Sequence, residues 1–334
     1  MKFRARYYAC ILLLAALAAQ PPLAAAAAPR QAPEAHYRAF DSKGRTIALG
    51  EILEAARSAD VLIIGETHND PVAHLLEAEL LRRADELLNM GAQRDRRAVA
   101  LSLEMFDRDV QPVLDEYLAG LISERHFLLS SRPWRNYETD YSPLVEYARG
   151  RALPVIAANA PARYVSRVSA NGPDSLRALP EASRRWLPPL PFPAASEPYA
   201  AKFRSFLAGE SAGAHTQPAS RQQSPHSSPA PTQQVSHGGS YLLDAQTLRD
   251  ASMAHAIAEH LGRRSGALVV HVNGKFHSEE RLGVPEQLRH YRAKARAVVV
   301  TILPGEGFPN FDAARLGPLG DFVILTDPAI PRSY

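Results

Sequence analysis

The chain has a single cysteine among its 334 residues, Cys10, which lies at the front of an N-terminal apolar run. The rest of the chain therefore has no thiol. This excludes disulfides, thiolate metal ligands and a cysteine nucleophile, and it suits an oxidising compartment. Stability must come from burial, for which a chain of this length is sufficient.

No apolar stretch is long enough to span a membrane. The run at 9–19 has about half of the roughly 20 residues that a spanning helix needs. Basic residues precede it and a small-residue tract follows at 24–28, so we expect a secretory signal peptide over residues 1–28. A lipoprotein cysteine would follow the run, whereas Cys10 is at its front. A lipid anchor is therefore not expected, and we predict a protein that is soluble in the periplasm or secreted after cleavage.

Clustered positive charge is also missing. The net charge is +3, and the arginines are scattered among acidic residues. A nucleic-acid partner is therefore not expected.

We predict a single domain over 29–334, interrupted at about 210–240 by a tract of mostly Ser, Pro, Gln, His, Ala and Gly. This tract has little apolar area to bury, so we expect a disordered insertion.

Short apolar runs alternate with segments of helical periodicity. Together they predict an α/β fold: a mostly parallel central sheet with helices on both faces, and helical lid-like segments in the proline- and aromatic-rich stretch 179–207. A charged outer face, which includes Glu77 and Asp85, is expected on the helix after Pro71. We expect a hairpin over 37–49, strands at 61–64, 98–103, 154–158, 267–272, 297–303 and 322–326, and helices at 53–58, 72–90, 110–118, 143–149, after Pro161, at 242–261 and after Pro285.

Polar residues follow several of the predicted strands. The first strand runs into Gly65-Glu66-Thr67-His68, the second into Glu104, the third into Asn159, and a later one into Gly274-Lys275-Phe276-His277. The carboxyl ends of parallel strands meet at one edge of a sheet, where ligands bind in open α/β folds. We therefore expect these side chains to converge.

Two imidazoles and two carboxylates allow two kinds of chemistry. Glu66, His68, Glu104 and His277 form a mixed nitrogen and oxygen set that suits a divalent transition metal. The same four residues can work without a metal, with a carboxylate as general base and a histidine as acid. The sequence leaves both open. His74 is either a supporting residue or a packing residue, and we expect structural roles for the histidines of the helix 242–261, which are His255 and His260.

The two glycine-x-x-histidine motifs, Gly65-Glu66-Thr67-His68 and Gly274-Lys275-Phe276-His277, together resemble the paired signatures of the ChaN-like haem-binding uptake proteins. This family belongs to the superfamily that includes Tiki, TraB and erythromycin-esterase-like proteins. The resemblance covers about residues 60 to 290. It extends to His74, Glu104-Met105-Phe106, residues 134–141, Gln246, Asp250, Met253, Ala254 and Gly283-Val284-Pro285.

The resemblance implies a periplasmic-side haem-binding protein in haem or iron acquisition, acting by binding rather than turnover. Its implied partners are haem, a second subunit, and outer-membrane or periplasmic uptake components. It also implies that a tyrosine between two subunits holds the haem iron, and the candidates are Tyr137, Tyr141, Tyr164 and Tyr199. The alternative that the wider superfamily implies is a metal-dependent esterase or protease that uses Glu66, His68, Glu104 and His277.

Overall fold

The computed structural model describes residues 32–89, 96–213 and 241–334, with side chains left out at 210–213. The predicted signal peptide, 1–28, lies outside the described residues. None of the helices within these ranges is both long enough and apolar enough to cross a membrane.

The described chain forms one eight-stranded sheet in the order β2-β1-β8-β7-β3-β6-β4-β5. The pairs from β8 to β5 are parallel, and β1 runs antiparallel to both β2 and β8. The strands are β1 (Tyr37–Asp41), β2 (Thr46–Ile47), β3 (Val61–Glu66), β4 (Val99–Asp107), β5 (Val155–Asn159), β6 (Leu268–Gly274), β7 (Ala297–Pro304) and β8 (Phe322–Thr326).

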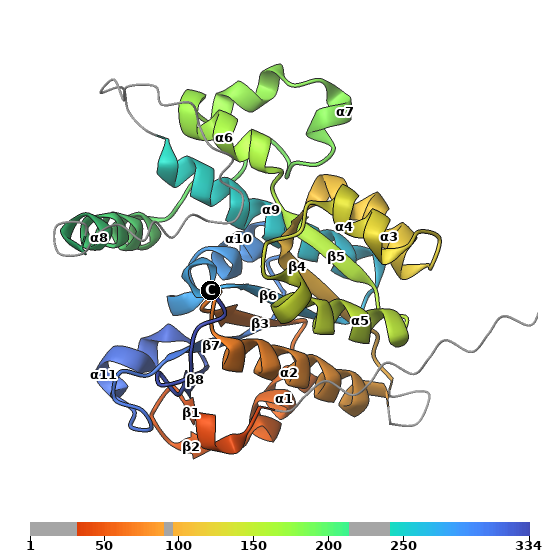
Figure 1. Ribbon diagram of the computed structural model, residues 1–334. Helices are drawn as coiled ribbons and strands as arrows, with labels where there is room; N and C mark the ends of the chain where they lie inside the picture. Colours follow the sequence, from red (N-terminus) through yellow and green to blue (C-terminus); the bar gives the residue numbers. More distant parts are fainter. Residues whose placement is uncertain (1–31, 90–95, 214–240) are drawn as a thin grey trace, which may run out of the picture.

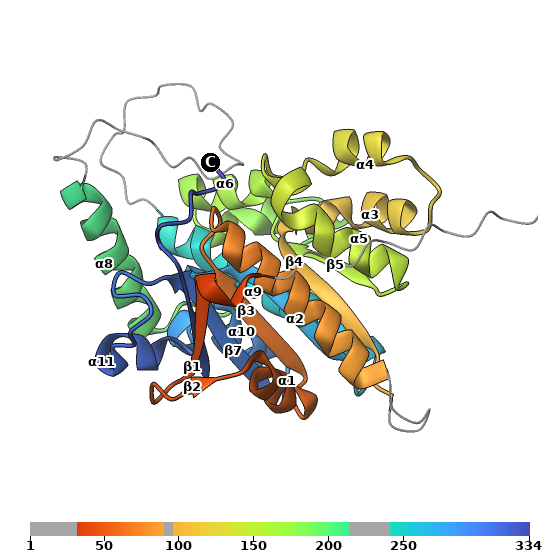
Figure 2. The same ribbon diagram turned by 60° about the horizontal axis from the view of Figure 1, so that its bottom comes forward.

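Helices cover both faces of this sheet (Figures 1 and 2). Helices α1, α2 and α5 lie on one face, and α9 and α10 lie on the other. The predicted α/β fold is therefore confirmed. The helices are α1 (Leu49–Arg57), α2 (Pro71–Asn89), α3 (Gln111–Leu118), α4 (Glu124–Ser131), α5 (Ser142–Gly150), α6 (Ala162–Asn171), α7 (Glu181–Arg184), α8 (Glu197–Gly213), α9 (Leu242–Arg263), α10 (Val284–Tyr291) and α11 (Ala313–Leu316). Short 3₁₀ or π turns are η1 (Glu34–His36), η3 (Arg108–Val110), η4 (Tyr137–Tyr141), η5 (Pro173–Ala178), η6 (Lys275–His277), η7 (Glu279–Arg281) and η8 (Gly317–Leu319).

Strand β3 lies in the middle of the sheet and packs on both faces. Leu62 and Ile64 join the core cluster beneath α1 and α2, whereas Val61 and Ile63 join the cluster beneath α9 and α10. Since every residue of β3 is buried, its sequence shows a continuous apolar run rather than alternation. This packing fixes the end of β3, and hence Glu66, rigidly at the carboxyl edge.

The boundaries of several elements differ from the sequence-based expectation. Strand β4 continues to Asp107, so Glu104 lies inside the strand rather than after it, next to a register shift against β5. Helix α1 begins at Leu49 instead of residue 53. A further helix, α4, was not expected. Of the predicted disordered tract, residues 210–213 belong to α8, and 214–240 lie outside the described residues.

The expected outer face of α2 is wrong at two positions. Glu77 and Asp85 are at most 1 % exposed, although both were placed among the charged outward residues. Asp85 is buried because Tyr147 and Arg151, from α5 and its C-cap, donate hydrogen bonds to its carboxylate. Glu77 is buried because it faces His74 and the end of β3. Local periodicity does not reveal such partners, since they come from another part of the chain.

Candidate active site at the carboxyl edge

The strand register brings the two glycine-x-x-histidine motifs together. Strand β3 pairs with β6 so that Glu66 lies opposite Gly274, and β6 pairs on its other side with β4, which carries Glu104. The backbone N–H of Gly274 donates a hydrogen bond of 2.7 Å to Glu104 Oε2. Of the residues predicted to converge, Glu66, His68, Glu104 and His277 all lie at this edge.

His68 rests directly on the backbone of Gly274. A Cβ atom at Gly274 would lie 2.6 Å from both Cε1 and Nε2 of His68, so only glycine leaves room for the imidazole. His68 Nδ1 donates to Glu66 Oε1 at 2.8 Å, and the ring meets Trp134 edge-on with 4.8 Å between centroids. Burial opposes protonation, but the Glu66 carboxylate outweighs it and raises the pKa of His68. With 37 % of its side chain exposed, His68 is the member of the four that solvent reaches.

His277 lies in η6 between two carboxylates. Its Nδ1 is 2.6 Å from Asp250 Oδ1 on α9, and its Nε2 is 3.3 Å from Glu104 Oε1. Burial would lower the pKa of His277, but the charges of Glu104 and Asp250 raise it to about 10. Burial would raise the pKa of Glu104, but His277, His68 and the Gly274 N–H hold it far below its usual value. Glu104 and His277 therefore form a buried ion pair at neutral pH.

Glu66 has a second set of partners on the α2 side. Tyr141 donates a hydrogen bond of 2.7 Å to Glu66 Oε1, and His74 Nδ1 lies 3.5 Å from Glu66 Oε2. His74 Nδ1 also lies 3.3 Å from Glu77 Oε2. Burial would lower the pKa of His74, but Glu77 and Glu66 raise it to about 10. Together, Glu66, His74 and Glu77 place three ligand atoms within 4.8 Å of one another, an arrangement that can hold a metal ion.

Some site residues were missed by the sequence analysis. Asp250 was noted only in the resemblance, yet it orients His277 and accepts a 2.5 Å hydrogen bond from Tyr199. His271, inside β6, hydrogen-bonds Ser102 Oγ at 2.9 Å, and burial lowers its pKa to about 4. For the buried contact between His74 and Glu77, the sequence did offer a local indication, because residues three apart lie on the same face of a helix.

Asn159, the last residue of β5, is fully buried, and neither side-chain amide atom forms a hydrogen bond. It pairs with Asp107, three residues beyond Glu104, across the register shift between β4 and β5. Its amide is therefore not hydrogen-bonded to Glu66, His68, Glu104 or His277. It therefore borders the site without belonging to the charged cluster.

The four candidate haem-ligand tyrosines are all buried. Tyr141 and Tyr199 donate to Glu66 and Asp250, and burial together with these carboxylates raises the pKa of both phenols well above 10. Tyr137 packs against Phe106 and Phe127, and burial raises its pKa as well. Tyr164 differs, because Arg163 donates a 3.2 Å hydrogen bond to its hydroxyl and lies over its ring.

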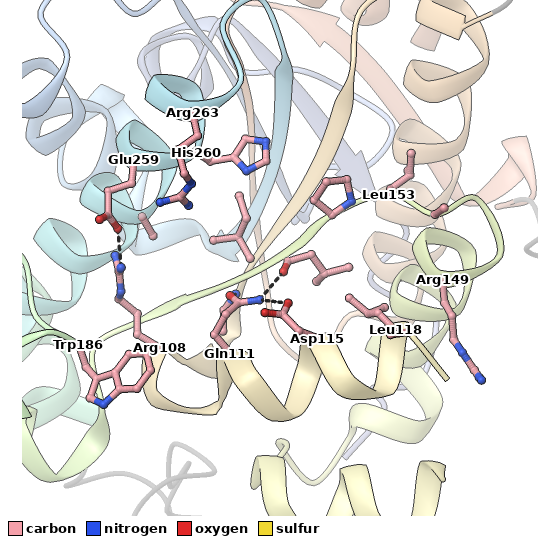
Figure 3. A pocket seen from close by; sticks show the side chains of 17 residues that line it. Arg108, Gln111, Asp115, Leu118, Arg149, Leu153, Trp186, Glu259, His260 and Arg263 are labelled. Carbon is pink, nitrogen blue, oxygen red and sulfur yellow. Dashed lines mark hydrogen bonds and ion pairs between the residues drawn. The ribbon is translucent and has the colours of Figure 1, made fainter. Parts of the chain in front are cut away.

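A surface cavity of about 630 Å³ lies away from this site, along the free edge of β5 (Figure 3). It is bounded by α3, β5 and the C-terminal part of α9, and Arg108 is paired with Glu259 at one end. Gln111 lies along β5, donating to Val155 O and accepting from Ala157 N.

The sequence predicted structural roles for His255 and His260. His255 stacks edge-on with Tyr291, and His260 lines the cavity.

Comparison with known families decides the relationship. The model of the family described as "Haem-binding uptake, Tiki superfamily, ChaN" matches residues 52–288, which include both motifs and the whole charged cluster. The chain belongs to this family. The ChaN resemblance inferred from the two motifs is therefore confirmed.

Two relatives of the ChaN-family chain are informative. The chain is similar in structure to the ChaN of Campylobacter jejuni, described as "Cofacial heme binding to ChaN of Campylobacter jejuni", with a TM-score of 0.61 and 16 % sequence identity. The match covers 88 % of this chain and 98 % of the Campylobacter chain. This shows a shared fold. The chain is also 27 % identical over 305 residues to RETICULATA-RELATED 5, a chloroplastic protein of Arabidopsis thaliana. That match covers 86 % of this chain but only 37 % of the plant protein.

Proposed function

We propose that this protein binds haem and serves in haem or iron acquisition, acting by binding rather than turnover. The observation that carries the proposal is membership of the ChaN haem-binding uptake family over residues 52–288. The fold shared with the Campylobacter jejuni ChaN, which is described as binding haem cofacially, supports it. On this proposal the protein works in the periplasm, after removal of residues 1–28, as a homodimer that exchanges haem with uptake components of the envelope.

The axial ligand on this proposal is a tyrosine, with Tyr164 ahead of Tyr137, Tyr141 and Tyr199. A phenolate oxygen is an established ligand of ferric haem. The Arg163 guanidinium places a positive charge beside the Tyr164 oxygen, whereas Tyr141 and Tyr199 must give up hydrogen bonds to carboxylates before binding iron.

Haemin titration of the purified mature protein tests the proposal. We expect a saturable Soret shift and a high-spin, phenolate-type spectrum, with Tyr164→Phe losing the phenolate band and Tyr137→Phe retaining it. A flat titration at micromolar haemin would refute haem binding. If the phenolate band is lost in the phenylalanine variant of another tyrosine instead, haem binding stands and that tyrosine is the axial ligand.

A second candidate function is favoured by the charged cluster, namely metal-dependent hydrolysis of an ester or peptide. His68 is open to solvent and hydrogen-bonded to Glu66, while Glu104 and His277 are paired beside it. A carboxylate here can act as general base toward water and an imidazole as acid. Esterase and peptidase activity should fall to background in a His68→Ala, His277→Ala double variant. If the activity is equal in the double variant and the native protein, this function is excluded.

A further inference from the structure

A compact group of metal-ligand side chains lies on the α2 side of Glu66. Glu66, His74 and Glu77 are at most 5 % exposed, and one ligand atom of each lies within 4.8 Å of the others. We propose that these three side chains bind a divalent transition-metal ion, with His74 Nδ1, Glu66 Oε2 and a Glu77 carboxylate oxygen as ligands. This set shares only Glu66 with the four residues expected from the sequence.

The spacing of these atoms already suits a metal. His74 Nδ1 is 3.3 Å from Glu77 Oε2 and 3.5 Å from Glu66 Oε2. A tetrahedral ion bound at about 2.0–2.1 Å separates its ligand atoms by about 3.3 Å. One nitrogen and two carboxylates suit Zn²⁺, Mn²⁺ or Fe²⁺. The two distances to His74 Nδ1 therefore match those around a bound ion, and the two glutamate oxygens lie within 4.8 Å of each other.

Both carboxylates have an oxygen to offer. Tyr141 and His68 donate to Glu66 Oε1, while Glu66 Oε2 receives no hydrogen bond. Glu77 Oε1 is likewise buried without a hydrogen-bond donor. Buried carboxylate oxygens are costly unless a donor or cation satisfies them. A cation beside His74 Nδ1 would satisfy Glu66 Oε2, which lies 3.5 Å from that nitrogen, and would draw on the Glu77 carboxylate, whose Oε2 lies 3.3 Å from it.

The Nε2 atom of His74 faces hydrogen-bond acceptors of the kind that orient metal-binding histidines. Its Nε2 lies 3.2 Å from His68 O and 3.3 Å from Asp140 Oδ2, so an N–H there has acceptors. Asn136 Nδ2 donates to Asp140 Oδ2 at 2.8 Å and holds that carboxylate in place. A carboxylate or carbonyl on the other ring nitrogen fixes the tautomer and orients the ligating nitrogen. The metal displaces the proton at Nδ1, since a ligating imidazole must be deprotonated there.

The Glu104 and His277 pair offers less. Asp250 and Glu104 contact different ring nitrogens of His277, so their oxygens flank the imidazole instead of converging on one of its atoms. Within the described ranges, Glu66, His74 and Glu77 are the set of three ligand residues found in mutual reach. The ion therefore belongs on the α2 side, from which its charge acts on Glu66 and, through Glu66, on the orientation of His68.

Equilibrium dialysis of the full mature chain against Zn²⁺ alone and against Mn²⁺ alone, with metal measured by mass spectrometry, tests the proposal. We expect one equivalent per chain for at least one ion and at least a tenfold weaker affinity in Glu77→Gln. Two variants should bind like the native protein. Glu86→Gln alters a carboxylate on the same helix whose side chain is 42 % exposed, and Glu104→Gln alters the other cluster.

Circular dichroism establishes whether Glu77→Gln is folded. If it is not, Asp140→Asn decides, because losing a support of a ligating histidine typically weakens metal affinity about 10–100-fold. Three results would overturn the proposal: no bound metal in the native protein, native affinity in folded Glu77→Gln, or loss of metal in Glu104→Gln alone. None of these bears on haem binding, which the haemin titration measures separately.

Discussion

At the residue scale, the missing side chain of Gly274 decides where His68 can lie. In Gly274→Ala the new Cβ would stand 2.6 Å from the imidazole, so His68 must move away from Glu66. We expect the pKa of His68, followed by NMR, to fall toward its ordinary value of about 6.5, and stability to fall by about 1–3 kcal/mol. Gly262→Ala, in open space on α9, is the control and should gain about 0.5–1 kcal/mol. An unchanged titration of His68 would contradict this account.

His271 gives the fold a defined response to acid. Its pKa is lowered to about 4 in the folded protein, because burial disfavours the charged ring. The unfolded chain takes up this proton near pH 6.5, so the contribution to stability is complete above pH 6.5 and is lost as the pH falls toward 4. Urea unfolding at pH 7.5 and pH 5 should show that this group costs about 2 kcal/mol at the lower pH, a loss that disappears in His271→Gln.

Single residues of the site were predictable to different degrees. Glu66, His68, Glu104 and His277 follow apolar runs of the central strands, and parallel topology brings the carboxyl ends of such strands together. Glu77 was placed on the outer face of its helix, because helical periodicity ranks residues by polarity and contains no information about a buried partner such as His74. Buried polar residues depend on contacts between distant segments, which no local window contains.

At the element scale, Gln111 protects an edge strand. Its amide satisfies Val155 O and Ala157 N on the outer side of β5. Gln111→Ala should expose this edge, cost about 1–3 kcal/mol and promote self-association, as unprotected strand edges do. Gln111→Glu keeps the acceptor for Ala157 N but not the donor, so it should be intermediate. Light scattering and chemical unfolding would measure both, and native behaviour of Gln111→Ala would show that the edge is protected otherwise.

Helix α8 is held against the second motif by Lys202. Its Nζ donates to the carbonyl oxygens of Phe276 and Glu279 at 2.9 and 3.3 Å. We expect Lys202→Met to accelerate amide exchange along α8 and to change exchange little in the central strands. Arg204→Met, which removes an exposed ion pair of the same helix, is the matched control. Equal exchange in both variants would mean that α8 is anchored mainly by the packing of Tyr199, Phe203 and Phe206 against Phe276.

The sequence predicted which helices and strands exist more reliably than it predicted where each one begins and ends. Continuous apolar runs revealed the central strands, and proline and glycine marked where helices start. The extension of β4 through Glu104 was missed because the acidic residues Glu104 and Asp107 break its apolar run. Beyond the register shift, β4 pairs with β5 again where Asp107 lies opposite Asn159.

At the scale of the whole molecule, the proposed haem binding predicts a change of assembly. The proposed function places the haem between the two subunits of a homodimer, so haem should hold the subunits together. We expect light scattering during gel filtration to report a larger dimer fraction with haemin than without it. Bound haemin on a monomer would refute the dimer while leaving haem binding in place.

The pairing of β3 with β6 has a consequence for how the protein matures. Glu66 meets Gly274 across that pair, so the first motif has no partner until the last third of the chain has emerged and inserted its strand between β3 and β4. Such distant pairing forms late, because the intervening chain must first be ordered. Until then Glu104 lacks both the Gly274 N–H and His277, so its buried ion pair cannot form. The complete charged cluster therefore exists only in chains that have folded through β6.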